Sequence, residues 1–201
     1  MLDGAARRVI DPALDRLGAA FARAGVTADQ VTWAGFLVGV AAAMAIAFRH
    51  FALGLVLILA SRLCDGLDGA VARHTAKTDR GGFLDIVLDF AFYGGIPLAF
   101  VIADPAANAV AGATLILSFY VNGATFLAYA VFAERRNLKS EARGPKSLYF
   151  TTGLAEATET ILVFCLFCLF PAAFAPLAYV FAALTFVTAA ARIALALKVF
   201  R

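Results

Sequence analysis

Residues 65–73 read DGLDGAVAR, and residues 81–89 read GGFLDIVLD. These two segments carry four aspartates, Asp65, Asp68, Asp85 and Asp89, in a chain whose residues are 63% hydrophobic. The members of each pair are three or four residues apart, so on helices they project from one face. Asp65 precedes Arg73 by eight residues, and Asp89 follows Gly81 by eight. A helical hairpin would therefore bring all four carboxylates to one level, about 12 Å from the helix ends.

The composition favours a membrane protein. The mean hydropathy is +0.86, and 15% of the 201 residues are charged, well below the usual quarter. Apolar stretches long enough to cross a bilayer predict an all-α integral membrane protein with six transmembrane helices. Pro171 and Pro176 are expected to separate the last two spans. The predicted spans are residues 31–48, 51–72, 81–103, 105–133, about 148–170 and about 177–199.

Residues 1–26 are expected to form an N-terminal amphipathic interfacial helix ahead of a membrane domain at residues 27–201. Asp11 is a candidate N-cap, with Pro12 at the first helical position. Apolar residues then recur at helical spacing, which favours a helix lying in the membrane surface. A short cytoplasmic helix packed on the loops is the alternative. The apolar residues are Ile10, Leu14, Leu17 and Phe21.

Basic residues predict the orientation. Of the 17 Lys and Arg residues, all but Arg49, Arg62 and Arg192 fall in the termini or near the loops at 73–82 and 134–147. The positive-inside rule makes that side cytoplasmic. The expected setting is the inner membrane of a bacterium. Membrane lipids and phosphate substrates account for the net charge of +3, so no nucleic-acid partner is expected. Cys165 and Cys168 form a C-x-x-C within an apolar stretch, which favours inert packing.

The four aspartates need positive partners. Each ionised aspartate at mid-bilayer costs about 2.5–3.5 kcal/mol. Arg62 or Arg73 could neutralise one or two of them. Clustered carboxylates without His or Cys favour Mg²⁺ or Mn²⁺, and two ions roughly 3.5–4 Å apart suit phosphoryl chemistry. A buried ion-pair network or the proton path of a carrier are the alternatives.

The spacing resembles a known family. Asp65-x-x-Asp68-Gly69-x-x-Ala72-Arg73, followed by Gly81-x-x-x-Asp85-x-x-x-Asp89, is similar to the signature of the CDP-alcohol phosphotransferases. The signature covers 25 residues, and the six-span layout extends the resemblance along the chain. Residues 27–32, TADQVT, are also similar to the opening of the family's first span.

The resemblance implies a reaction and a set of site residues. A CDP-linked donor, usually CDP-diacylglycerol, gives its phosphatidyl group to an alcohol acceptor and releases CMP. The family also implies a two-fold homodimer with an active site open to the cytoplasmic leaflet. By this resemblance Asp65, Asp68 and Asp85 are metal ligands, and Asp89 is a shared ligand or the base. Gly69, Ala72 and Gly81 line the nucleotide site, and Arg73 holds a donor phosphate.

The acceptor site is less defined. Glu156 and Glu159 lie one turn apart at about the depth of the aspartates, and Arg192 is only slightly shallower. These side chains are candidates for binding the acceptor. Pairing of the glutamates with Arg192 or Arg62 is an equally good interpretation. The basic loop at 134–147 is another candidate, for a phosphorylated acceptor such as glycerol phosphate or inositol phosphate.

Two other functions use similar carboxylates. An intramembrane prenyltransferase pairs aspartate motifs with Mg²⁺, but its motifs lack the Gly-x-x-Ala-Arg that follows Asp68 here. A cation carrier would place its sites and helix breaks near mid-membrane. The four aspartates instead cluster toward one side, so the transferase is the favoured interpretation.

Overall fold

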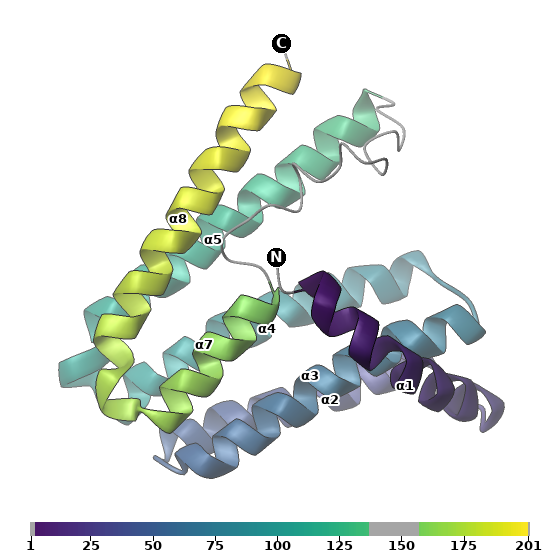
Figure 1. Cartoon of the computed structure of the whole chain (residues 1–201), viewed down its shortest axis with the longest axis horizontal. Coiled ribbons are helices and arrows are strands. Elements are labelled where there is room, and N and C mark those ends of the chain that lie inside the picture. Colours follow the sequence, from purple (N-terminus) through teal and green to yellow (C-terminus); the bar gives the residue numbers. More distant parts are fainter. Residues whose placement is uncertain (1–2, 137–156, 201) are drawn as a thin grey trace.

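The computed structural model describes residues 3–136 and 157–200, which are almost entirely helical and contain no strand. Figure 1 shows the helices in chain order from purple to yellow. Their bounds are α1 Asp3–Arg23, α2 Ala28–Ala47, α3 Phe51–His74, α4 Asp79–Ala103, α5 Pro105–Arg135, α7 Ala157–Leu169, the 3₁₀ turn η3 Pro171–Ala173 and α8 Phe174–Val199.

Local side-chain chemistry fixes where the helices begin. Thr27 caps α2 with a reciprocal pair of bonds: its hydroxyl accepts from the Gln30 N–H at 3.3 Å, and the Gln30 side chain accepts from the Thr27 N–H at 3.0 Å. Thr78 caps α4 by accepting from the Gly81 N–H at 3.0 Å. Asp104 caps α5 in the same way, ahead of Pro105. The two caps at Thr27 and Thr78 place the starts of α2 and α4, which later form part of the site.

The helices form two groups (Figure 1). In one group α2, α3 and α4 pack together and α1 lies across α3; in the other α5 and α8 run side by side. An aromatic core joins α4, α7 and α8, where Phe100 stacks on Phe174 with ring centroids 4.9 Å apart. Phe164 and Phe167 of α7 are fully buried in the same core. This dry core fixes α4, the helix that carries Asp85 and Asp89, against the rest of the chain.

Four helical stretches among the described residues are long and apolar enough to cross a membrane: α2, α4, α5 and Pro171–Val199. The second predicted span is present as α3, which has 24 residues but carries at least three charged residues in every 18-residue stretch. The fifth predicted span begins outside the described residues, and its visible part is the 13-residue α7. The count of six spans therefore stays a prediction.

The predicted break before the last span is confirmed in part. The chain leaves the α-helix at Phe170 and turns through η3, which begins at Pro171. Pro176, in contrast, lies in the first turn of α8, where a missing N–H costs no intrahelical bond. One proline thus suffices to separate α7 from α8.

The predicted start of the N-terminal helix is wrong. α1 begins at Asp3 and Pro12 lies inside it, so Asp11 is not its N-cap. A proline in a helix removes one backbone hydrogen bond, which this exposed helix tolerates. Of the predicted apolar residues only Leu14 is buried, and an added Cβ on Gly66 of α3 would lie 2.8 Å from it. The place of α1 in the membrane surface stays a prediction.

α1 approaches α3 very closely at Gly18. A Cβ added to Gly18 would lie 2.7 Å from the Ala70 Cβ and 2.8 Å from the Ala70 carbonyl carbon. Real Cβ atoms do not approach backbone so closely, so only glycine permits this crossing. The crossing places Asp15 of α1 beside the end of α3, where Arg73 lies.

Candidate active site

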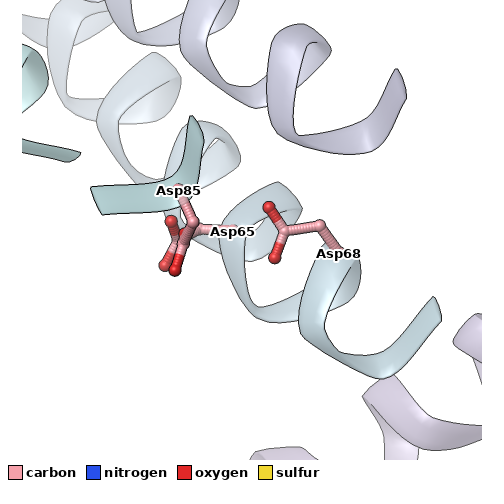
Figure 2. Close-up of side chains that lie close together, drawn as sticks. All are labelled: Asp65, Asp68 and Asp85. Carbon is pink, nitrogen blue, oxygen red and sulfur yellow. The ribbon is translucent and has the colours of Figure 1, made fainter. Parts of the chain in front are cut away.

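Asp65, Asp68 and Asp85 converge on one point between α3 and α4. One carboxylate oxygen from each lies within 4.8 Å of the others (Figure 2). Asp68 is buried and Asp65 is half-buried, whereas Asp85 is exposed. The helical hairpin predicted from the sequence therefore does bring carboxylates of both helices together. Three carboxylates at this separation provide the all-oxygen ligand set that Mg²⁺ and Mn²⁺ prefer.

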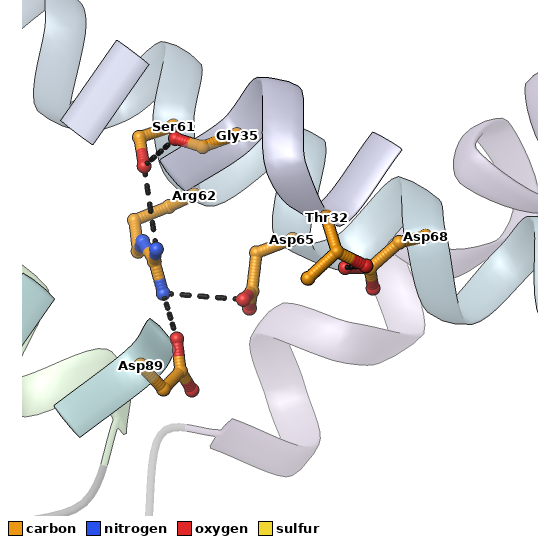
Figure 3. Close-up of polar contacts among 7 residues, drawn as sticks. All are labelled: Thr32, Gly35, Ser61, Arg62, Asp65, Asp68 and Asp89. Carbon is orange, nitrogen blue, oxygen red and sulfur yellow. Dashed lines mark hydrogen bonds and ion pairs between the residues drawn. The ribbon is translucent and has the colours of Figure 1, made fainter. Parts of the chain in front are cut away.

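Thr32 of α2 adds a hydroxyl to this group. Its Oγ1 lies 2.7 Å from Asp68 Oδ2 and 3.0 Å from the Ala28 carbonyl, so its one proton serves one acceptor at a time (Figure 3). In the sequence, Thr32 is notable only as part of the segment at residues 27–32. The one further signal is that it lies a single helical turn after Ala28, at the start of α2. The hydroxyl ties α2 to the carboxylate group on α3.

Arg62 of α3 contacts two of the aspartates. Its Nη1 lies 2.7 Å from Asp89 Oδ1 and 3.3 Å from Asp65 Oδ1 (Figure 3). Of the two arginines expected to neutralise the carboxylates, Arg62 does so. Asp89 lies in the same small cavity as Asp65, Asp68 and Asp85 but is not within their group.

A larger cleft of about 1040 Å³ opens beside the carboxylates. It lies between the start of α2, the end of α3 and the start of α4, and Thr32, Asp68 and Asp85 line both it and the small cavity. The four residues that the family resemblance assigns to the nucleotide site also line it. They are Gly69, Ala72, Arg73 and Gly81.

Charged side chains of both signs line the cleft, the carboxylates being Asp29, Asp68 and Asp85. Lys77 and Arg80 line it together with Arg73, and Trp33 of α2, 44% exposed, stands in its wall. A Cβ added to Gly69 or Gly82 would meet nothing within 4 Å, so these glycines face open space. Packing therefore does not explain Gly69. The open space at Gly69 and Gly82, beside three cations and two helix N-termini, suits a phosphate-bearing ligand.

Arg73 also contacts α1. Asp15 Oδ1 lies 3.3 Å from Arg73 Nε and 3.3 Å from His74 Nε2. The hydrogen bond from Arg73 is the largest cause that holds the pKa of Asp15 below its ordinary value of 3.8. The expected neutralising role of Arg73 toward the four aspartates is thus not what the structure shows, because its nearest carboxylate is Asp15.

Comparison with known proteins identifies the chain. The family model of the CDP-alcohol phosphatidyltransferases matches residues 25–197. The chain belongs to this family. It is 44% identical over 193 residues to the inner membrane protein YnjF of Escherichia coli, covering 96% of the chain and 94% of that protein.

Shorter matches connect this CDP-alcohol phosphatidyltransferase to two archaeal enzymes. The archaetidylinositol phosphate synthase of Methanothermobacter thermautotrophicus is 44% identical over 84 residues, and that of Pyrococcus horikoshii is 36% identical over 77 residues. The two matches cover 41% and 38% of the chain, and 40% and 41% of the archaeal proteins.

Two of the candidate acceptor residues of this CDP-alcohol phosphatidyltransferase, Glu159 and Arg192, are among the described residues. Glu156 lies outside the described residues, as does most of the basic loop at 134–147. Glu159 is half-buried in the first turn of α7, and Arg192 of α8 donates to Asn122 Oδ1 of α5 at 3.1 Å. Neither Glu159 nor Arg192 lines the small cavity or the cleft. Asn122 was not singled out from the sequence, because a single amide carries no motif.

The cysteines match the expectation of packing. Cys165 and Cys168 of α7 are free thiols, and Cys168 belongs to the buried aromatic core. Neither of the two cysteines lines the small cavity or the cleft.

Proposed function

We propose that this CDP-alcohol phosphatidyltransferase moves the phosphatidyl group of CDP-diacylglycerol to an alcohol and releases CMP, with two divalent cations, Mg²⁺ or Mn²⁺. The proposal rests on one observation: the small cavity that holds the carboxylates and the larger cleft meet at Thr32, Asp68 and Asp85. A carboxylate group suited to divalent cations lies at one end of a cleft that is lined by Arg73, Lys77 and Arg80. A nucleotide diphosphate needs both environments side by side.

The cleft supplies the donor site. Arg73, Lys77 and Arg80 provide positive charge for the diphosphate and the CMP phosphate, and arginine can bind phosphate through two parallel hydrogen bonds. Gly69 and Gly82 let the nucleotide approach the backbone. Asp68 and Asp85 at the inner end face the diphosphate, so the reacting phosphorus lies next to the small cavity.

The residues fit the cations that the family implies. Asp65, Asp68 and Asp85 would hold them, because every donor atom in the group is a carboxylate oxygen. The fourth carboxylate, Asp89, supports a second ion: four negative charges less the one positive charge of Arg62 leave three to be neutralised. Bound cations would offset the charge that develops on the departing CMP phosphate. Thr32 orients Asp68 for this task through its 2.7 Å contact.

Asp89 is the proposed base. An alcohol oxygen attacks the phosphorus of the phosphatidyl group, the bond from that phosphorus to the CMP oxygen breaks, and the alcohol proton passes to Asp89. Asp89 lies in the small cavity and is 30% exposed, so an incoming hydroxyl can reach it. Its second role, as a shared metal ligand, follows the family signature.

The proposed setting is the inner membrane, with the active site and both termini on the cytoplasmic side. The relative YnjF is named an inner membrane protein, and many large apolar side chains of α2 to α5 are exposed, as lipid contact requires. α1 would then lie in the membrane surface, and the spans would number six. A homodimer follows from the family resemblance.

The test is CMP release by the purified protein in detergent. CDP-diacylglycerol and Mg²⁺ or Mn²⁺ are supplied with single alcohols, including glycerol phosphate and inositol phosphate, since two relatives are archaetidylinositol phosphate synthases. CMP formation with at least one acceptor is expected. Absence of CMP with every acceptor would overturn the proposal, and diphosphate release from a prenyl diphosphate would support the prenyltransferase instead.

A further inference from the structure

Arg62 stands between two parts of the carboxylate cluster. Its guanidinium contacts Asp65 and Asp89 on opposite helices, and its side chain is only 9% exposed. The three carboxylates that lie within 4.8 Å of one another exclude Asp89, which is the nearer partner of Arg62 at 2.7 Å. Arg62 Nη1 therefore links Asp89 to Asp65, which is one member of the group of three.

The guanidinium is fixed by groups other than the aspartates. Its Cζ lies 3.9 Å above the centre of the buried Phe92 ring, a cation–π contact that also sets the plane of the group. Its Nη2 donates to Ser61 Oγ at 3.3 Å, and the Ser61 hydroxyl in turn donates to the Gly35 carbonyl at 2.8 Å. Ser61 is fully buried. Arg62 thus has a defined position that does not depend on either carboxylate.

The fixed guanidinium of Arg62 limits which carboxylate oxygens can bind a metal ion. Asp89 Oδ1 and Asp65 Oδ1 face the guanidinium, while Asp68 and Asp85 make no ion pair with it. A divalent cation next to Asp89 would have to lie close to the positive charge of Arg62. Like charges in a partly buried site repel strongly, so the favourable place for a cation is beside Asp68 and Asp85, which make no ion pair with Arg62, with Asp65 as the third ligand.

We propose that Arg62 is a positioning residue: its guanidinium lies between Asp65 and Asp89, in the place that a second cation would otherwise occupy, so that the donor-free protein binds one divalent cation and Asp89 is held in position for the acceptor hydroxyl. The role of Asp89 toward the acceptor rests on the proposed function, whereas the number of bound cations does not. In the donor complex, oxygen atoms of the donor would complete the coordination of the second cation.

The test compares Arg62→Gln and Arg62→Lys with the wild type, and with Arg49→Gln as the control. Arg49 also makes two hydrogen bonds, to the Ala103 carbonyl at 3.0 and 2.8 Å, but lies outside both cavities of the site. Bound Mn²⁺ is counted in donor-free detergent solution by electron paramagnetic resonance of the remaining free ion. Melting temperature and CMP release are measured on the same samples.

The expected result for Arg62→Gln is unusual for the loss of a charged site residue. The number of Mn²⁺ ions bound should rise from one to two, or the first should bind at least tenfold tighter, while kcat falls at least a hundredfold. Arg62→Lys should bind one Mn²⁺ and lose about tenfold in kcat, because an ammonium group cannot hold two carboxylates in one plane. The Arg49→Gln protein should match the wild type in both respects.

Unchanged Mn²⁺ binding and unchanged kcat in Arg62→Gln would overturn the proposal, and so would weaker Mn²⁺ binding accompanied by a collapsed melting temperature in both variants. If Arg62→Gln does not fold, Arg62→Lys decides, and a wild-type kcat there would refute the positioning role. Mn²⁺ binding is independent of turnover. A wild type that binds one Mn²⁺ but releases no CMP would therefore contradict the proposed reaction while leaving the proposed role of Arg62 among the carboxylates in place.

Discussion

Replacing Gly39 of α2 with alanine should impair the site by displacing the residues that hold Arg62. A Cβ at Gly39 would lie 2.7 Å from Phe92 Cδ2 and 3.1 Å from Ser61 Oγ. Ordinary contact begins at 3.4 Å, so the Phe92 ring must move by about 3.4 − 2.7 = 0.7 Å. Both neighbours are the groups that hold Arg62, whose Cζ lies 3.9 Å above the ring. Moving Phe92 and Ser61 should therefore displace Arg62 and, through it, Asp89, although the new methyl group contacts no carboxylate.

The two effects of the substitution differ in size. Overpacking costs about 1–3 kcal/mol, and replacing a helical glycine by alanine returns about 1 kcal/mol, which leaves a net loss of about 0–2 kcal/mol. The protein should thus fold. Turnover should suffer more than stability, because a displacement approaching 1 Å in a catalytic arrangement costs up to about a hundredfold in rate. We expect kcat to fall by about 10–100-fold, with the KM for the donor within a few-fold, since the cleft is lined by other residues.

The assay is CMP release at saturating donor, alongside the melting temperature in detergent. Gly94→Ala in α4 is the matched control, because a Cβ there would meet nothing within 4 Å. That variant should keep full turnover and melt at the wild-type temperature or above. If Gly39→Ala folds and turns over at the wild-type rate, the chain of contacts from Phe92 through Arg62 to Asp89 does not control the chemistry.

Four further outcomes are expected. Excess EDTA should abolish CMP release and Mg²⁺ or Mn²⁺ should restore it; undiminished release would rule out metal-dependent catalysis. Asp89→Asn should bind donor normally but lose most of its kcat, because an amide cannot accept the alcohol proton; near-normal kcat would refute the base assignment. Thr32→Val should weaken Mn²⁺ binding several-fold by freeing the Asp68 carboxylate from its 2.7 Å contact, and an unchanged titration would show that the hydroxyl does not orient the ligand. The pKa of Asp15 is lowered, chiefly by Arg73, so its contribution to stability is present above about pH 3.8 and is lost as the pH falls through the lowered value. The wild type should therefore melt above Asp15→Asn at neutral pH, and this difference should vanish in strong acid. No difference at neutral pH would show that the contact is not stabilising.

The helical hairpin was predictable because its signals are local. Aspartates at spacings of three and four, placed equally far from the turn between two apolar stretches, meet wherever both stretches are helical. The caps at Thr27 and Thr78 are equally local, since a side chain there bonds to a backbone N–H three residues away. The same reasoning failed at Pro12, because a proline that suits a helix start is also tolerated in an exposed helix when one lost bond is compensated by packing elsewhere.

Contacts between distant segments could not be read from the sequence. Arg62 and Arg73 were equal candidates to neutralise the aspartates, and the crossing of α1 at Gly18 decides between them by placing Asp15 beside Arg73. The sequence shows that Gly18 is a glycine but not which helix it meets. The contact between Arg192 and Asn122 could not be read from the sequence for the same reason, because the two residues are 70 positions apart.

The position of Trp33 gives this protein a natural optical probe. It is the chain's single tryptophan, and it stands 44% exposed in the wall of the cleft, with its ring edge-on to Phe36 at 6.1 Å. All indole fluorescence therefore originates at the proposed donor site, and a nucleotide entering the cleft changes the surroundings of that one emitter. Donor occupancy can be followed by this emission without a label, in variants that no longer turn over, and with cations added before or after the nucleotide.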